Sequence, residues 1–387
     1  MITGERQCAE LESRFQLQRV PAQRLIPAGL KVKWGSATRV LPQRPIRWGD
    51  VRSRLLPLTR APRAHDVLIA RVAELNRHTG IELDSGRKSR FFPGDVLGLV
   101  FGHRYATRQF LGDVPPLMRR YHILSQGGVC GRVLSAPSKF SEPTLVEPLG
   151  YWSDHDRIAN LRDYAPQPIP DAPRIRTILV VGSSMDAGKS TTAASLVRGL
   201  THAGRVVHAG KLTGTACVKD LNLMADAGAV QTLDFSQIGF ASTSQESRES
   251  IEQLCETIRS RLSAGGPDYL VLEIADGLTQ RETRYVLDYF TRKRLVDDVA
   301  LAVHDALAAP ACIDFLQREW DLQPTFVSGV ATLSPLSTGE LEAVCPFPCL
   351  PASELQHPEV VRWLDGQAGS CFDRARQVSV TPADNHS

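Results

Sequence analysis

The second half of the chain alternates between two patterns of hydrophobic residues. Apolar runs of the length of a buried strand lie at residues 178–181, 206–209, 269–274, 299–303 and 325–327. Residues 189–203, 251–262 and 306–319 are expected to be helices, and Ile251, Leu254, Ile258 and Leu262 mark the apolar face of the second. Strands that alternate with helices form a parallel sheet covered on both faces. We therefore predict an α/β fold over residues 176–375, with a doubly wound, mainly parallel sheet.

The pattern is different between His65 and residue 150. Short β-like runs at residues 67–72, 80–83, 90–92, 96–101 and 128–134 are separated by turns such as Asp84-Ser-Gly86 and Pro93-Gly-Asp95. This pattern predicts a small β-barrel or sandwich over residues 65–150. The stretch 160–175 is rich in proline, which makes a stiff linker, and we place the domain boundary there.

The junction between the first strand and the first helix carries a phosphate-binding pattern. Its residues are Gly182, Ser183, Ser184, Met185, Asp186, Ala187, Gly188, Lys189, Ser190 and Thr191. A glycine loop between a buried strand and a helix is typical of a P-loop, because unpaired N–H groups at the helix N-terminus bind phosphate oxygens. The alternative is an ordinary strand-to-helix turn with a capping serine. The order of strand, loop and Gly-Lys-Ser-Thr favours the P-loop.

The polar residues of this loop have separate roles in that interpretation. Lys189 would neutralise the terminal phosphates of a nucleotide, and the Ser190 hydroxyl would ligate a magnesium ion that bridges them. Asp186 would bind metal, take a proton from the acceptor, or cap the following helix. Lys189 and Asp186 are therefore candidate catalytic residues.

Two further candidates lie at the ends of neighbouring strands. Glu273 ends an apolar run and precedes Ala275-Asp-Gly277, at the edge where doubly wound sheets bind ligands. An acid there can hold magnesium opposite Ser190, so Ser190 and Glu273 are the predicted metal ligands. Lys211, in Gly210-Lys-Leu-Thr-Gly-Thr215, is the third candidate catalytic residue because it should face the γ-phosphate. The alternative is that both residues are solvated positions after a strand.

These motifs resemble those of dethiobiotin synthetase and its relatives. Gly182 and Gly188 are separated by five residues, which is normal in that group, whereas the commonest P-loop has four. Leu272-Glu-Ile-Ala-Asp-Gly277 looks like a variant of the group's Val-Glu-Gly-Ala-Gly-Gly, and the resemblance implies that Glu273 is the metal-binding glutamate. Lys211 matches by position a lysine that helps to bind the acceptor. Both segments differ from the group's pattern, so its diamine substrate does not carry over.

Other P-loop proteins provide two more comparisons. Ser184 stands where the arsenite-pump and division-site-selection ATPases carry a second lysine, which disfavours a dimerising ATPase of that kind. The segments Gly210-Lys-Leu-Thr-Gly-Thr215, Asp226-Ala-Gly-Ala229 and Asp234-Phe235 together look like a less studied P-loop family, over about residues 177–350. That resemblance implies ATP binding and an association with N-acylation of acidic amino acids.

Composition excludes several other classes of protein. The chain has 387 residues, of which 42% are hydrophobic and 22% charged, which is ordinary for a globular protein. Its apolar runs are far shorter than the roughly 18 residues of a membrane span, and we expect a cytoplasmic protein without membrane contact. Eight cysteines, most of them isolated in apolar contexts, fit a reduced protein. Cys345-Pro-Phe-Pro-Cys349 is the only close pair, and two ligands without a second pair do not make a zinc site.

Three segments remain open at this stage. Residues 1–60 are a basic extension with 12 Lys or Arg against four acids, in a chain of net charge +3. This extension is either an arm for nucleic acid or a solvated segment, and its scattered charges with few aromatics argue against nucleic acid. Gly102-His-Arg-Tyr105 either presents polar groups to a ligand or caps the barrel. Residues 377–387 are a polar tail.

These motifs are compatible with three functions. We favour an ATP- and Mg²⁺-dependent enzyme that activates a small acid or carbamate by phosphoryl transfer, leading to ligation or ring closure. The alternatives are a nucleotide-dependent switch or chaperone ATPase, and an acyl-CoA-dependent N-acyltransferase whose P-loop binds the coenzyme phosphates. Ser328-Gly-Val-Ala-Thr332 is not the Asn-Lys-x-Asp motif of GTPases, which favours ATP over GTP. The expected partners are a nucleotide and a small-molecule acceptor, and a homodimer is left open.

Overall fold

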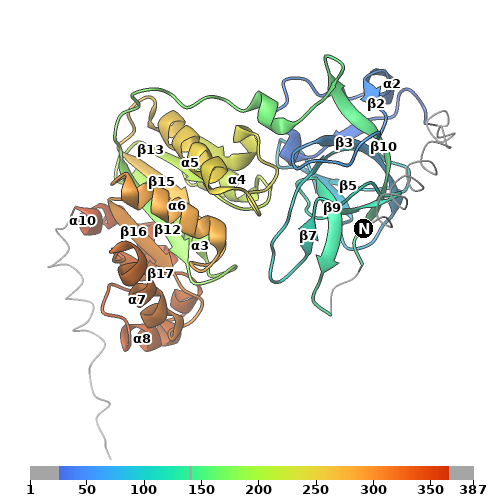
Figure 1. Ribbon diagram of the computed structural model, residues 1–387. Coiled ribbons are helices and arrows are strands. Elements are labelled where there is room, and N and C mark those ends of the chain that lie inside the picture. Colours follow the sequence, from blue (N-terminus) through green and yellow to red (C-terminus); the bar gives the residue numbers. More distant parts are fainter. Residues whose placement is uncertain (1–25, 139–141, 366–387) are drawn as a thin grey trace, which may run out of the picture.

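The computed structural model describes residues 26–138 and 142–365, which form two domains joined by an extended segment (Figure 1). The first domain is built from β-strands, and the second is a parallel sheet covered by helices. In the described part of the chain, no helix combines the length and the apolar character that a membrane crossing requires.

The β-strands of the first domain close into a barrel. Its ring consists of β3 (Val67–Glu74), β6 (Val96–Phe101), β9 (Val129–Ser135), β8 (Tyr121–Ile123) and β10 (Leu145–Asp154). Each strand pairs with the next, and β10 pairs with β3 to close the ring. The nine-stranded sheet is completed by β1 (Val32–Trp34), β2 (Leu55–Leu56), β7 (Leu111–Asp113) and β11 (Arg157–Ile158). A separate hairpin joins β4 (Gly80–Glu82) to β5 (Lys88–Arg90). The first domain is therefore a barrel, which is one of the two forms predicted for it.

Residues 26–60, for which the sequence predicted no structure, pack into this barrel. Strand β1 pairs with β6, and Trp48 of the short helix α2 (Trp48–Arg52) is fully buried. Trp34 packs edge-on against Trp152, with ring centroids 5.4 Å apart. Gly98 makes room for it, since a Cβ at Gly98 would lie 2.1 Å from the Trp34 ring. The described part of the basic extension is thus part of the barrel, and residues 1–25 lie outside the described residues.

The second domain is the predicted doubly wound sheet. Its strands are β12 (Arg176–Gly182), β13 (Val207–Lys211), β14 (Gln231–Asp234), β15 (Tyr269–Glu273), β16 (Asp298–Ala302) and β17 (Phe326–Ser328). They run in parallel in the order β14-β13-β15-β12-β16-β17. After β12 the chain moves to one side of this strand as far as β15, and it then crosses to the other side for β16 and β17. Ligands of such sheets bind where the direction reverses, which here is the carboxyl end of β12.

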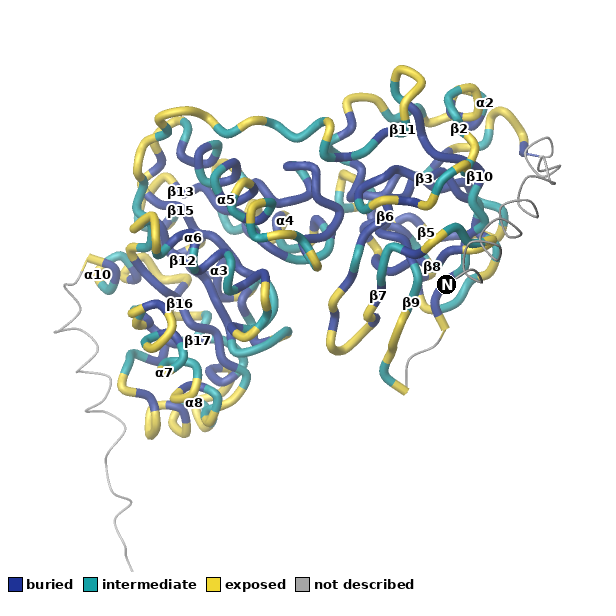
Figure 2. Tube along the Cα trace, in the orientation of Figure 1, coloured by how far each residue is buried: buried dark blue, intermediate teal, exposed yellow. Residues whose placement is uncertain are grey.

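Helices cover both faces of this sheet (Figure 1). One face is covered by α3 (Lys189–His202), α4 (Lys219–Asp226), α9 (Ala352–Leu355) and α10 (Val360–Leu364). The other is covered by α5 (Arg248–Ser263), α6 (Arg281–Arg292) and α7 (Ala308–Trp320), and α8 (Pro335–Glu342) follows β17. The central strands are buried along their whole length, whereas the helices turn an exposed face outward (Figure 2). Burial on both faces explains why these strands are continuous apolar runs in the sequence.

The two domains are in direct contact. The Glu82 carboxylate of the barrel accepts a hydrogen bond from the Val218 backbone, 2.5 Å away, and the His65 ring lies 2.8 Å from the Glu246 carboxylate. Arg39 forms an ion pair of 3.2 Å with Asp234 at the end of β14. The barrel is therefore held against the carboxyl edge of the parallel sheet, where the candidate site lies.

Candidate nucleotide-binding site

The loop between β12 and α3 is held in place by close contacts with the segment after β17. Gly188 caps α3 with a left-handed φ of 97°, which glycine adopts without steric cost. A Cβ at Gly188 would lie 2.9 Å from the Gly329 Cα, so the loop also needs glycine for this close approach. The Val330 N–H donates a 3.0 Å hydrogen bond to the Ala187 carbonyl. The segment after β17 thus fixes the position of the loop.

Lys189 lies over its own loop. Its ammonium group donates a 2.7 Å hydrogen bond to the Ser184 carbonyl, and the residue is 6% exposed. Burial lowers the pKa of Lys189, although the negative charge of Glu273 acts in the opposite direction. The loop therefore carries a positive charge at the start of α3, where the helix N-terminus also attracts anions.

Three charged side chains form a compact cluster beside Lys189. The Ser190 hydroxyl donates a 2.9 Å hydrogen bond to Glu273 Oε1, and Lys211 Nζ lies 3.1 Å from the same oxygen. Lys211 also forms an ion pair with Asp220 of α4. Burial alone would lower the pKa of Lys211, but the carboxylates of Glu273 and Asp220 outweigh it and raise this pKa well above its usual range. Lys211 therefore keeps its positive charge between the two carboxylates.

The second oxygen of Glu273 provides a test of whether the cluster fits a metal ion. Glu273 is 1% exposed, and its Oε2 atom is buried without any hydrogen-bond partner in the described structure. A buried carboxylate oxygen without a partner is unfavourable unless a cation or a donor occupies the adjacent space. Ser190 and Glu273 thus fit the two protein ligands that Mg²⁺ takes when phosphates and waters supply the rest. The described residues contain no group of three His, Cys, Asp or Glu side chains that could hold a metal ion.

Asp186 lies apart from this cluster. It is exposed at the tip of the loop with a left-handed φ of 63°, and its carboxylate is 3.7 Å from Arg108 of the barrel. Ser183 turns the other way and accepts a 3.2 Å hydrogen bond from the His304 backbone. Thr191 is exposed on α3, and Met185 is partly buried. The structure therefore brings Lys189, Ser190, Lys211 and Glu273 together and leaves Asp186 at the domain boundary.

Two acidic residues of the site are not among the site residues predicted from the sequence. Asp220 pairs with Lys211, nine positions earlier in the chain, and this pairing depends on a helix in a stretch that looks like a loop. Lys211 lowers the pKa of Asp220, outweighing the effect of burial. Asp276 follows Glu273, and burial raises its pKa although Lys189 and Lys211 oppose this. Only the Ala275-Asp-Gly277 segment was visible as part of a motif.

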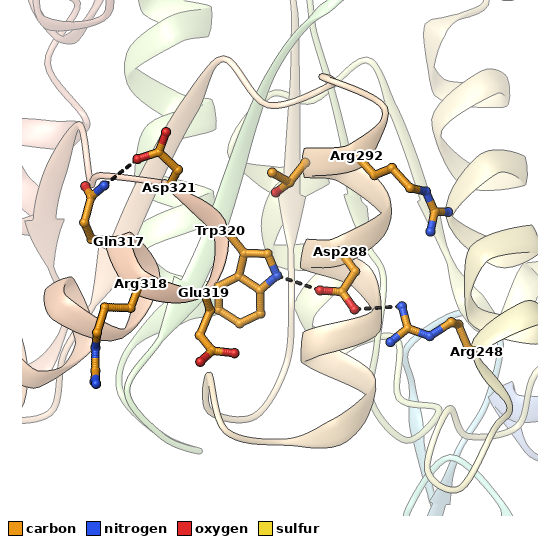
Figure 3. Close-up of a pocket in the computed structure, with 9 residues that line it drawn as sticks. Arg248, Asp288, Arg292, Gln317, Arg318, Glu319, Trp320 and Asp321 are labelled. Atoms are coloured by element: carbon orange, nitrogen blue, oxygen red, sulfur yellow. Dashed lines mark hydrogen bonds and ion pairs between the residues drawn. The ribbon is translucent and has the colours of Figure 1, made fainter.

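A hollow on the described surface lies away from the loop between β12 and α3. It is open to solvent, has a volume of about 530 Å³, and is lined by residues of α5, α6 and α7 with the residue that follows α7 (Figure 3). Asp288 in its wall accepts hydrogen bonds of 2.7 Å from both Arg248 and Trp320 (Figure 3). Because its central carboxylate is already paired with two donors, this hollow is no alternative to the P-loop as a phosphate site.

The comparisons with known proteins find matches among solved structures alone. No protein-family model matches the chain, and neither does any curated protein. Among solved structures, the signal recognition particle 54 kDa protein from Aeropyrum pernix K1, in complex with GDP, is 18% identical with a TM-score of 0.35. A DUF1611 family protein from Anabaena variabilis is 12% identical with a TM-score of 0.37, and the signal recognition particle receptor FtsY from Elizabethkingia anophelis is 15% identical with 0.34.

These matches cover only parts of the molecules compared. They include 56%, 55% and 55% of this chain, and 52%, 65% and 75% of the three solved chains in the same order. Scores this low do not establish a relationship, and the resemblance to the dethiobiotin synthetase group stays a prediction. The geometry of the chain itself shows the coarser result: a parallel sheet whose β12 leads through a glycine loop into α3 is a P-loop NTPase fold.

Proposed function

We propose that this chain binds ATP with Mg²⁺ at the loop of residues 182–191 and transfers the γ-phosphoryl group to a small acid or carbamate. The observation that supports this most is the Glu273 Oε2 atom, buried without a partner beside the Ser190 hydroxyl and Lys211. The activated acceptor would then undergo ligation or ring closure.

The chemical step makes one bond and breaks one bond. An acceptor carboxylate oxygen attacks the γ-phosphorus, the bond from phosphorus to the β–γ bridging oxygen breaks, and ADP leaves. Ser190 and Glu273 would hold Mg²⁺, which would supply positive charge to the phosphates. Lys189 would exchange its hydrogen bond to the Ser184 carbonyl for the phosphates.

Lys211 is the residue that connects the nucleotide to the acceptor. Its ammonium group is fixed by Glu273 on one side and Asp220 on the other, so its position is set before any ligand binds. A cation held in this way stabilises charge that develops between donor and acceptor without reorganising during the reaction. A flexible surface lysine would not provide this.

The test is acid-dependent release of ADP. Purified protein is incubated with ATP, Mg²⁺ and a panel of small carboxylates, and hydroxylamine traps acyl phosphates. We expect ADP release that requires an acceptor, and a loss of about 10²–10³-fold in Lys189→Ala and Glu273→Gln. Glu340→Gln is the matched control, because Glu340 is an exposed acid of α8. Its activity should equal that of wild type.

The same assay separates the other functions. Hydrolysis that no carboxylate or amine stimulates would reject the proposal and favour a nucleotide-dependent switch. Consumption of acetyl-CoA in the absence of ATP would reject it in favour of an acyltransferase.

A further inference from the structure

The segment His103–Gln109 of the barrel faces the P-loop domain at both ends. It connects β6 to β7, and Figure 1 shows β7 on the side of the barrel that faces the parallel sheet. Gly102, just before the segment, lies against Ala241 of the second domain. Near its other end, Arg108 lies 3.7 Å from Asp186 in the P-loop. The segment thus runs along the edge of the candidate site.

Arg104 in this segment is a buried cation without a carboxylate. It is 8% exposed, and its Nε and Nη1 atoms are buried without hydrogen-bond partners in the described structure. Only Nη2 is used, in a hydrogen bond to the Gln109 side chain. Burial lowers the pKa of Arg104 to about 10, so the guanidinium still carries its charge at neutral pH.

The groups around Arg104 do not balance its charge. His78 is its close neighbour, and burial together with the Arg104 charge lowers the pKa of His78 to about 4, so this ring is neutral. The Glu82 carboxylate of the barrel is already bonded to Ser36, Cys217 and the Val218 backbone. The ring Nδ1 atom of His103 is also buried without a partner. Unpaired donors therefore gather on the barrel side of the domain boundary.

A buried guanidinium with two free donors is costly in the absence of an anion. A ligand that brings a carboxylate would satisfy both the charge and the free N–H groups. The loop after β13 runs from the phosphate site to the barrel, because Cys217, six residues after Lys211, lies 3.4 Å from the Glu82 carboxylate of the barrel.

We propose that Arg104 binds a carboxylate group of the acceptor, in a subsite between the barrel and the P-loop domain. This assignment rests on the proposed function, in which the acceptor is a small acid, and it names the residue that recognises it. It also gives the barrel a role in acceptor binding. The P-loop domain alone would bind the nucleotide, but it would lack the Arg104 guanidinium.

A purely structural role for Arg104 makes a different prediction about stability. If its bond to Gln109 held the segment in place, Arg104→Met would unfold more easily than wild type. If the guanidinium is kept for a ligand, Arg104→Met removes an unpaired buried charge and should raise the Tm of the ligand-free protein by about 2–4 °C. Functional sites commonly sacrifice stability in this way.

The experiment measures carboxylate binding without nucleotide. The full chain is titrated calorimetrically with two- to six-carbon mono- and dicarboxylates and their uncharged amides, at constant ionic strength. We expect at least one carboxylate to bind wild type, its amide not to bind, and Arg104→Met to lose about 10- to 100-fold in affinity. Arg157→Met is the matched control, because Arg157 is exposed on β11. ADP affinity should be the same in all variants.

Each other outcome overturns the proposal. These are a lower Tm of Arg104→Met, equal carboxylate affinity in this variant and wild type, amides that bind as well as acids, and no carboxylate that binds wild type. If Arg104→Met does not fold, Arg104→Lys decides, and unchanged affinity in that variant rejects the subsite. Failure of the proposed function would give a different result. Wild type would then bind a carboxylate, and Arg104→Met would lose this binding, but no carboxylate would cause ADP release. That result would support the subsite and reject phosphoryl transfer.

Discussion

Lys211 and Arg104 are both cations with little exposure near the domain boundary, but their surroundings differ. Lys211 lies between the carboxylates of Glu273 and Asp220, whereas no carboxylate of the described residues pairs with Arg104. In the first cluster the cation is paired with two carboxylates of the fold, and one oxygen of Glu273 is left free. The second has donors that the fold does not use. A paired cation contributes to stability, and an unpaired one indicates where a ligand completes the structure.

The largest effect that tests this comparison is expected for Lys211→Met. Removing the cation leaves Glu273 and Asp220 facing each other in a buried site, which should cost about 3–5 kcal/mol of the free energy of unfolding. Urea denaturation checks this, and added Mg²⁺ should recover part of the loss because it neutralises the same carboxylates. The sign is opposite to that expected for Arg104→Met.

Lys219→Met is the control for Lys211→Met. Lys219 is exposed at the start of the helix that carries Asp220, so its loss should change stability by no more than about 0.5 kcal/mol. Equal stability of Lys211→Met and wild type would mean that the cluster is not held by its charges, and the comparison with Arg104 would then fail.

The same comparison explains how much of the site could be predicted from the sequence. Lys189 and Ser190 lie in one short segment, and Glu273 and Lys211 each end an apolar strand, so position along the chain predicted that they meet. Asp220 could not be found in this way. Its helix α4 has eight residues and buries only Leu221 and Met224, too few positions to show a helical period.

The sequence predicted some elements of the fold and not others. The central strands were visible because they are buried on both faces, and β14 was missed because it is a four-residue edge strand that is only half buried. Helix α6 was missed because its buried residues are interrupted by charged ones. In the barrel, Trp34 and Trp48 are core residues of a stretch broken by prolines, and Arg104 became conspicuous only when the fold showed which donors stay unpaired.

Lowering the pH should reduce the stability of the protein by a smaller amount, and the barrel should lose stability before the P-loop domain does. His78 is 5% exposed with a pKa of about 4, against about 6.5 in an unfolded chain. Between these values the unfolded state binds a proton that the folded state does not, so stability is complete above pH 6.5 and falls as the pH decreases towards 4. The loss from His78 is on the order of 3 kcal/mol. The pKa of Asp220 is lowered instead, so the P-loop cluster loses stability only below the usual range of a carboxyl group.

Hydrogen exchange read peptide by peptide checks this difference. Peptides from β3 and β10 should lose protection between pH 6.5 and 4, after correction for the intrinsic exchange rate, while peptides from β12 and β15 keep theirs. His78→Phe should flatten the response of the barrel, because Phe has no proton to bind and preserves the ring contact with Phe110. Simultaneous loss in both domains would place the acid-sensitive group outside the barrel.

The smallest change in stability is expected for substitutions of Asp186. Its backbone conformation and its carboxylate can be tested separately. Its left-handed φ of 63° favours glycine over alanine, so Asp186→Ala should lose about 1 kcal/mol of stability and Asp186→Gly should lose none. Its ion pair with Arg108 is exposed on both sides and adds little. If Asp186 serves only to shape the loop, Asp186→Gly and Asp186→Asn release ADP at the wild-type rate. If its carboxylate takes part in the reaction, both variants lose activity while their ADP affinity and their Tm stay unchanged, and Asp186 then joins the catalytic group from the side of the barrel.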